Sequence, residues 1–173
     1  MSLSGKKIAI LAENLYQELE VWYPLLRFRE AGAQVVVVGS GSATEHTSKL
    51  GYPVAVDQFA DAVKAADYDA VIIPGGYAPD IMRRYPAMVR LVKDMADQEK
   101  VVAAICHGGW MLASAEVVQG KTVTAFFAIK DDLVHAGANF IDAEVAVDGN
   151  LITSRKPEDL PAFCQAIIKA LGG

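Results

Sequence analysis

The stretch Val101-Val102-Ala103-Ala104-Ile105-Cys106-His107-Gly108-Gly109 is the most informative part of this sequence. A short apolar run leads into a cysteine and a His-Gly-Gly turn, and a helical pattern follows at 110–115. This is the layout of a nucleophile elbow, in which a strained turn between a strand and a helix lifts one side chain above the sheet edge. Backbone N–H groups after such a turn can stabilise an oxyanion, and a helix N-terminus favours a thiolate. We therefore interpret Cys106 as a nucleophile.

The other interpretation of Cys106 is a buried structural residue at a strand end, because free cysteine is among the most buried residue types. The tight His-Gly-Gly turn favours the functional interpretation, since a purely structural site has no need of it.

Outward from this stretch, apolar runs alternate with amphipathic helical periodicity. Four valines in succession at 35–38 are typical of a strand that is covered on both faces in a parallel sheet. Strands are expected at 7–12, 34–39, 69–74, 101–105, 122–125, 143–147 and 151–153, helices at 18–31, 60–66, 86–99, 110–115, 129–136 and 157–171, and a loop with a short hairpin at 40–58. This alternation predicts one α/β domain over 1–173, a three-layer sandwich with a mainly parallel central sheet.

Composition narrows the class of protein. The chain has 173 residues, of which 53% are hydrophobic and 21% charged, so it can bury a sizeable core. Its net charge of -5, without a basic block, argues against nucleic acid or an anionic membrane as the main partner. No apolar stretch approaches the roughly 20 residues that span a bilayer, and no signal-peptide pattern begins the chain, so a cytoplasmic location is expected. Two cysteines and three histidines without ligand spacing predict neither a disulfide framework nor a metal site, and we expect no cofactor.

Ligands of parallel α/β folds bind beyond the C-terminal strand ends, where several candidate groups converge. Gly75 and Gly76 end the strand that precedes the elbow strand in the sequence. Their surroundings match neither of the two phosphate-binding patterns, G-x-G-x-x-G and G-x-x-x-x-G-K-[ST]. We therefore interpret them as a loop with a backbone N–H that faces the nucleophile. Glu18 and Glu20 begin the first long helix, where carboxylates are favourable on their own account. A carboxyl beside Cys106 could alternatively tune the thiol and exchange a proton with it.

Three further polar residues are expected to be ordinary. Cys164 lies on the apolar stripe of the last helix, which predicts an inert core residue. His46, in a polar loop, and His135, at the end of a short helix, are expected at the surface.

Together, several motifs resemble the PfpI family, the superfamily of the intracellular cysteine peptidase PfpI and the Parkinson-disease-associated protein deglycase. The resemblance covers essentially the whole chain. It rests on residues 20–24, 73–80, 104–108, 129–132 with 136–137, 142–145 with 148–150, and 153–155 with 157 and 159–160. It implies a flavodoxin-like fold that is similar to class I glutamine amidotransferases, although this chain lacks their His-x-Glu pair after Cys106.

The resemblance also implies a role for each matched residue. Cys106 looks like the nucleophile, and Glu20 looks like the acidic residue that hydrogen-bonds its sulfur. The glycines Gly75, Gly76 and Gly108, with the backbone at His107, would form the oxyanion or substrate pocket.

In the peptidase branch, the histidine after the nucleophile pairs with an acidic residue of a neighbouring subunit. Here His107 and Asp80 occupy these positions, Asp80 being shorter than the family's glutamate. The resemblance thus implies a homo-oligomer, a dimer or a ring of three dimers. Asp80 could instead cap the short helix after Pro79. Gly109 and Phe126 depart from the family, which often has proline and tyrosine there.

These features predict a cytoplasmic cysteine-dependent hydrolase that acts on peptides or on glycated and aldehyde adducts. The alternative is a non-catalytic stress or redox-sensing protein with the same reactive thiol. A small-molecule binding module is a third, weaker possibility.

Overall fold

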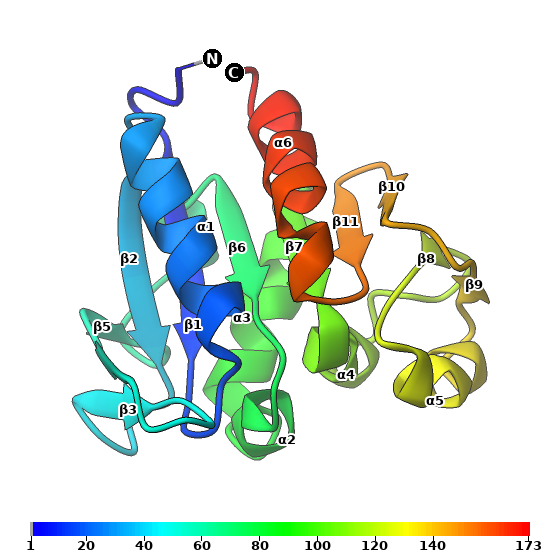
Figure 1. The fold of residues 1–173 in the computed structure, drawn as a ribbon, viewed down its shortest axis with the longest axis horizontal. Helices are drawn as coiled ribbons and strands as arrows, with labels where there is room; N and C mark the ends of the chain where they lie inside the picture. Colours follow the sequence, from blue (N-terminus) through cyan, green and yellow to red (C-terminus); the bar gives the residue numbers. More distant parts are fainter. Residues whose placement is uncertain (1) are drawn as a thin grey trace.

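The computed structural model describes residues 2–173, which build one seven-stranded sheet in the order β10-β11-β7-β6-β1-β2-β5 (Figure 1). All neighbouring strands run parallel except β10, which is antiparallel to β11. The strands are β1 (Lys7–Ala12), β2 (Gln34–Gly39), β5 (Gln58–Phe59), β6 (Ala70–Ile73), β7 (Val101–Ile105), β10 (Val145–Asp148) and β11 (Leu151–Ser154). The predicted mainly parallel sheet is confirmed.

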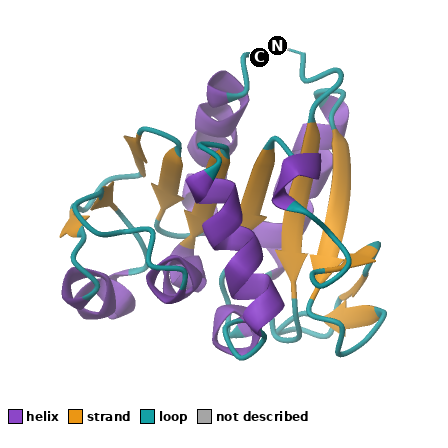
Figure 2. Cartoon of the chain, turned by 180° about the vertical axis from the view of Figure 1, so that it is seen from behind, coloured by secondary structure: helices purple, strands orange, loops and turns teal. Residues whose placement is uncertain are grey.

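Helices cover both faces of this sheet, as the continuous apolar strands predict. The helices are α1 (Glu18–Glu30), α2 (Ala78–Met82), α3 (Pro86–Asp97), α4 (Gly109–Ser114), α5 (Lys130–His135) and α6 (Leu160–Ala170). In Figure 1, α1 and α6 lie in front of the sheet and contact each other, and Figure 2 shows α3 across the opposite face. The three-layer α/β sandwich follows from this arrangement.

Two small two-stranded sheets lie outside the central sheet. The expected hairpin consists of β3 (Glu45–Thr47) and β4 (Pro53–Ala55), which pair antiparallel. A second sheet pairs β8 (Thr122–Val123) with β9 (Asn139–Phe140) in parallel. Within residues 2–173, no helix combines the length and apolarity needed to cross a membrane.

The helix predicted at 60–66 is wrong. This segment instead follows the edge strand β5 and has only one 3-10 turn, Ala65–Asp67. The backbone N–H groups of Asp57 and Ala60 donate to carbonyls of Val37 and Gly39 in β2. The bond of Ala60 holds the start of the segment at the sheet edge, and the residues after it form separate turns, with Ala62 N–H donating to Phe59 and Tyr68 N–H to Ala65, instead of a continuous helix.

His46 is also not the surface residue that its polar loop predicts. Its side chain is fully buried, and its Nδ1 lies 2.9 Å from Oε1 of Glu13 at the end of β1. Burial alone would raise the pKa of Glu13, but hydrogen bonds from His46, Ser40 and the backbone lower it to about 2. The carboxylate thereby ties the β3–β4 hairpin to the strand end beside the site.

Candidate active site

The predicted elbow is present at the C-terminal end of β7. Cys106 has a left-handed backbone with φ of +60°, a strained conformation for a side-chain-bearing residue, and it begins a 3-10 turn, Cys106–Gly108, that continues into α4. A Cβ on Gly108 would lie 2.5 Å from the Ile73 carbonyl oxygen. Glycine is therefore required for the turn to pack against β6, and this packing holds the thiol above the sheet.

Glu20 lies beneath the thiol, completely removed from solvent in the first turn of α1. The Gln17 side chain caps this helix by accepting the Glu20 N–H, and Oε2 of Glu20 accepts the Gly75 N–H at 2.6 Å. Burial raises the pKa of Glu20 to about 8, against smaller opposing effects of hydrogen bonds with Gly75 and Cys106. At neutral pH the carboxyl therefore keeps its proton.

The thiol itself differs from the sequence expectation. Burial, followed by the charge of the Glu20 carboxylate, raises the pKa of Cys106 to about 12, although the backbone N–H groups of His107 and Gly76 favour the ionised form. The expected thiolate-favouring elbow is thus outweighed by desolvation, because only 7% of Cys106 is exposed. When Glu20 is protonated, its negative charge is absent, and burial is then the main effect that opposes ionisation of the thiol. A nearby base is needed to remove the thiol proton.

His107 is placed to be that base. Its Nδ1 lies 3.3 Å from the Cys106 Sγ, and burial lowers the pKa of the imidazole, so the ring is neutral at pH 7. The ring stacks on Phe126 at 4.9 Å between centroids and meets Trp110 edge-on at 5.0 Å. Among residues 2–173, no carboxylate lies within 4.0 Å of this imidazole. Aromatic packing rather than an acid orients the ring within the chain.

A pocket of about 410 Å³ opens above the thiol. Gly76 lines it, whereas Gly75 and Gly108 are not among its lining residues. The Gly75 N–H is already donated to Glu20, and Gly108 is pressed against β6. The free backbone donors that face the sulfur are those of Gly76 and His107.

Asp80 does not reach this pocket from its own chain. It lies in α2, where it forms an ion pair with Arg84 that lowers the pKa of its carboxyl. No side chain caps α2, so the alternative capping role for Asp80 is wrong.

Several pocket residues escaped the sequence analysis. Gln17, Lys49, Tyr77 and Trp110 also line the pocket. Lys49 comes from the hairpin, far from Cys106 in sequence, and its backbone N–H donates to the Tyr16 carbonyl. Hydrogen bonds between segments that are far apart in the sequence bring it to the thiol, so no local pattern could have identified it.

Known proteins are similar to this chain in sequence and in fold. The model of the DJ-1/PfpI family matches residues 6–170. The chain belongs to the DJ-1/PfpI family. A deglycase of Thermococcus kodakarensis is 43% identical over 95% of this chain and 99% of its own length. General stress protein 18 of Bacillus subtilis is 37% identical over 92% of this chain and 94% of its own length.

The solved structure of a two-domain protein from Anabaena variabilis, which contains DJ-1/ThiJ/PfpI-like and ferritin-like domains, superposes with a TM-score of 0.94. Its sequence is 43% identical, and the match covers 96% of this chain and 48% of that protein. The fold of this DJ-1/PfpI protein is therefore that of its family.

The two cysteines are expected to differ in reactivity by at least about tenfold in the folded protein. Cys106 faces a pocket and a neutral imidazole, whereas Cys164 lies 1% exposed on the inner face of α6, as its apolar stripe predicts. Mass spectrometry after limited iodoacetamide treatment measures both sites in one sample. The unfolded protein is the control, in which both cysteines should react equally. Equal labelling of the two in the folded protein would contradict this expectation.

Proposed function

We propose that this protein is a cytoplasmic cysteine-dependent hydrolase that acts on aldehyde or glycation adducts, or on peptides, through Cys106. The observation that carries the proposal is the His107 Nδ1 at 3.3 Å from the Cys106 sulfur, beside the fully buried Glu20 carboxyl. Burial lowers the pKa of the imidazole and raises that of the carboxyl, which favours the neutral form of both. The deglycase name of a relative at 43% identity supports this class of reaction.

In the proposed reaction, His107 takes the thiol proton as sulfur attacks a carbonyl carbon. The N–H groups of Gly76 and His107 stabilise the resulting oxyanion. With an aldehyde, the proton returns to oxygen and a hemithioacetal forms. With a peptide, the proton goes to the leaving amine and a thioester remains, which water hydrolyses. The neutral Glu20 supports sulfur without adding a second negative charge.

Turnover of methylglyoxal and of a peptide reporter, each compared with Cys106→Ser, tests the proposal and distinguishes its two substrate classes. The second candidate is a non-catalytic redox sensor, which the general stress protein among the relatives supports. A sensor would show oxidation of Cys106 by dilute peroxide and no turnover of either substrate.

Glu20→Gln is expected to flatten the pH dependence of stability. The folded pKa of Glu20, about 8, lies above the ordinary value of 4.5, so the folded state holds a proton that the unfolded state releases. The free energy of unfolding therefore falls as pH rises from about 4.5 to about 8, by an amount on the order of a few kcal/mol. Urea denaturation at pH 5, 6.5 and 8 measures this loss.

Glutamine removes the titrating group and keeps an oxygen that can accept the Gly75 N–H, so the variant should lose less stability over this range. Glu18→Gln is the matched control, because Glu18 is the other carboxyl of the first turn and hydrogen bonds lower its pKa, out of this window. A parent and a Glu20→Gln variant with the same slope would disprove the assignment.

We further propose that the active form is a homo-oligomer. Leu19, Leu26, Leu50 and Tyr52 leave more than half of their surface exposed around a hollow between α1 and the hairpin. Such a concentration of large apolar side chains is typical of an association surface. In the oligomer, Asp80 of one chain would orient His107 of another, directly or through water.

Because Asp80 of one subunit is proposed to orient the His107 imidazole of another, Asp80→Asn is expected to lower kcat by about 10- to 100-fold without dissociating the oligomer. Kinetics together with light scattering checks this. Arg84→Gln is the matched control, because it breaks the same ion pair and leaves the carboxylate in place. A fully active monomer, or an oligomer indifferent to Asp80→Asn, would remove the shared site.

A further inference from the structure

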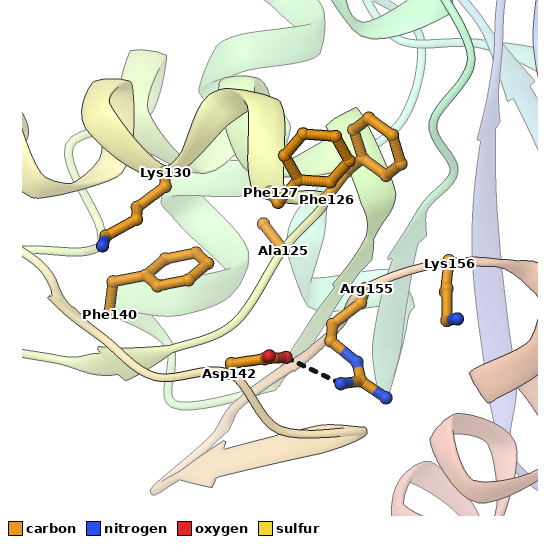
Figure 3. A pocket seen from close by; sticks show the side chains of 8 residues that line it. All are labelled: Ala125, Phe126, Phe127, Lys130, Phe140, Asp142, Arg155 and Lys156. Carbon is orange, nitrogen blue, oxygen red and sulfur yellow. Dashed lines mark hydrogen bonds and ion pairs between the residues drawn. The ribbon is translucent and has the colours of Figure 1, made fainter.

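A second hollow, of about 550 Å³, lies beside the thiol pocket (Figure 3). Its size is within the range of small-molecule sites. Phe126, Phe127 and Phe140 contribute its aromatic walls, and Lys130, Arg155 and Lys156 contribute its cationic groups. The small β8–β9 sheet, the segment before α5 and the segment after β11 meet at this hollow.

The two hollows share a wall. Phe126 lines both, and its ring stacks on the imidazole of His107 on one side. On the other side it contacts Phe127, with 4.6 Å between ring centroids. Lys156 in the second hollow directly precedes Pro157, which lines the thiol pocket. The two hollows are therefore neighbours on either side of the Phe126 side chain.

The cationic side chains of this hollow differ in whether they form ion pairs. Arg155 donates to Asp142 at 2.7 Å and to Asp159 at 2.8 and 3.2 Å, so its single positive charge is outnumbered by two carboxylates and is not available to an anionic ligand. By contrast, within residues 2–173 neither Lys130 nor Lys156 has a carboxylate oxygen within 4.0 Å. Lys130 instead lies over the Phe140 ring, 5.9 Å from its centroid. These two lysines leave uncompensated positive charge around aromatic walls.

Exposure of the aromatic wall points to an occupant. Phe127 is 76% exposed, which is unusual for a large apolar side chain that lines a hollow next to a reactive group. A planar ring stacked against it would gain offset or edge-to-face contacts in addition to the apolar area that it buries. An anionic group on that ring would meet the free lysines.

We propose that the second hollow is a substrate subsite for an aromatic carboxylate, such as the end of a peptide or amino-acid adduct that carries an aromatic ring and a free carboxyl group. This rests on the proposed function, because it assigns the part of the substrate that lies beyond the carbon attacked by Cys106. Phe126 and Phe127 hold the ring, and Lys130 and Lys156 attract the carboxylate.

Alkylation rates test this subsite without any turnover. Three iodoacetamides are compared at pH 7.5: 4-(iodoacetamido)benzoate, neutral iodoacetanilide and a trimethylammonium-substituted iodoacetanilide. In each reaction the Cys106 sulfur bonds to the methylene carbon, iodide leaves and the thiol proton passes to buffer. Mass spectrometry gives the rate constant at Cys106, which is divided by that for glutathione to remove differences in intrinsic reactivity.

The carboxylate reagent is expected to react about 3- to 10-fold faster than the neutral one, and the cationic reagent more slowly, because two solvent-exposed charges each contribute modestly. Lys130→Gln with Lys156→Gln should bring the carboxylate-to-neutral ratio close to one. Lys64→Gln is the matched control, an exposed lysine at the opposite end of the sheet, before the turn leading into β6. Its ratio should equal that of the parent.

Equal normalised rates for the three reagents in the parent would overturn the subsite, as would a ratio that the double lysine variant leaves unchanged. The first result is also expected if a second copy of the chain covers the hollow. Loss of the proposed function gives a different result, since a protein without turnover would still show the charge preference at Cys106.

Discussion

Cys106→Ser is expected to reduce turnover of methylglyoxal or of a peptide reporter by at least about 10³-fold, the scale on which loss of a nucleophile acts. A serine hydroxyl at this position ionises far less readily and is a much weaker nucleophile than a thiol. Steady-state kinetics of the purified variant measures the effect.

Cys164→Ser provides the matched control for this experiment. It makes the same chemical change at a buried position on α6, remote from the pocket, so it should lower stability without a comparable loss of kcat. Retention of parental turnover by Cys106→Ser would contradict the proposed chemistry and leave the thiol without a catalytic role.

Gly76→Ala is expected to destabilise the fold by roughly 2–5 kcal/mol and to abolish most of the activity. Gly76 has a φ of +77°, and a Cβ there would lie 2.5 Å from the Leu15 carbonyl oxygen and 2.6 Å from the Gln17 nitrogen. Both neighbours are backbone atoms of the loop after β1, so they cannot rotate away. The loop after β6 would have to move, and with it an N–H that faces the Cys106 sulfur.

Gly120→Ala separates crowding from backbone strain. Gly120 has a similar φ of +72°, but a Cβ there would meet no atom within 4 Å. This control should cost only the roughly 1–2 kcal/mol of the left-handed conformation and should leave kcat near the parental value. Urea denaturation and kinetics on both variants are the measurements. Equal losses in the two would show that close approach of the loops is unimportant.

Much of the layered fold is readable from the sequence for a simple reason. The valine run at 35–38 and the run that begins at Val101 are continuous and apolar, and only strands covered on both faces tolerate such runs. The apolar stripe that contains Cys164 likewise predicted the buried face of α6. The helix predicted at 60–66 failed because tertiary bonds override propensity there: Ala60 bonds to β2, and only separate turns follow it.

The elbow also was readable, because its glycines and cysteine are adjacent in the chain and obey a local steric requirement. The burial of His46 was not readable. Nothing in its polar loop indicated that the side chain would be buried in contact with Glu13, which follows a strand distant in the sequence. Lys49 joined the pocket for the same reason, through hydrogen bonds between segments far apart in sequence.

The parallel sheet and the elbow could thus be predicted, because they depend on neighbouring residues and on short-range sterics. The raised pKa of the thiol could not, because it depends on tertiary packing. Burial under the loops places a neutral carboxyl beneath Cys106 and a neutral imidazole beside it, and raises the pKa of the thiol instead of lowering it. Desolvation depends on every segment that covers a group, and no local motif contains that information.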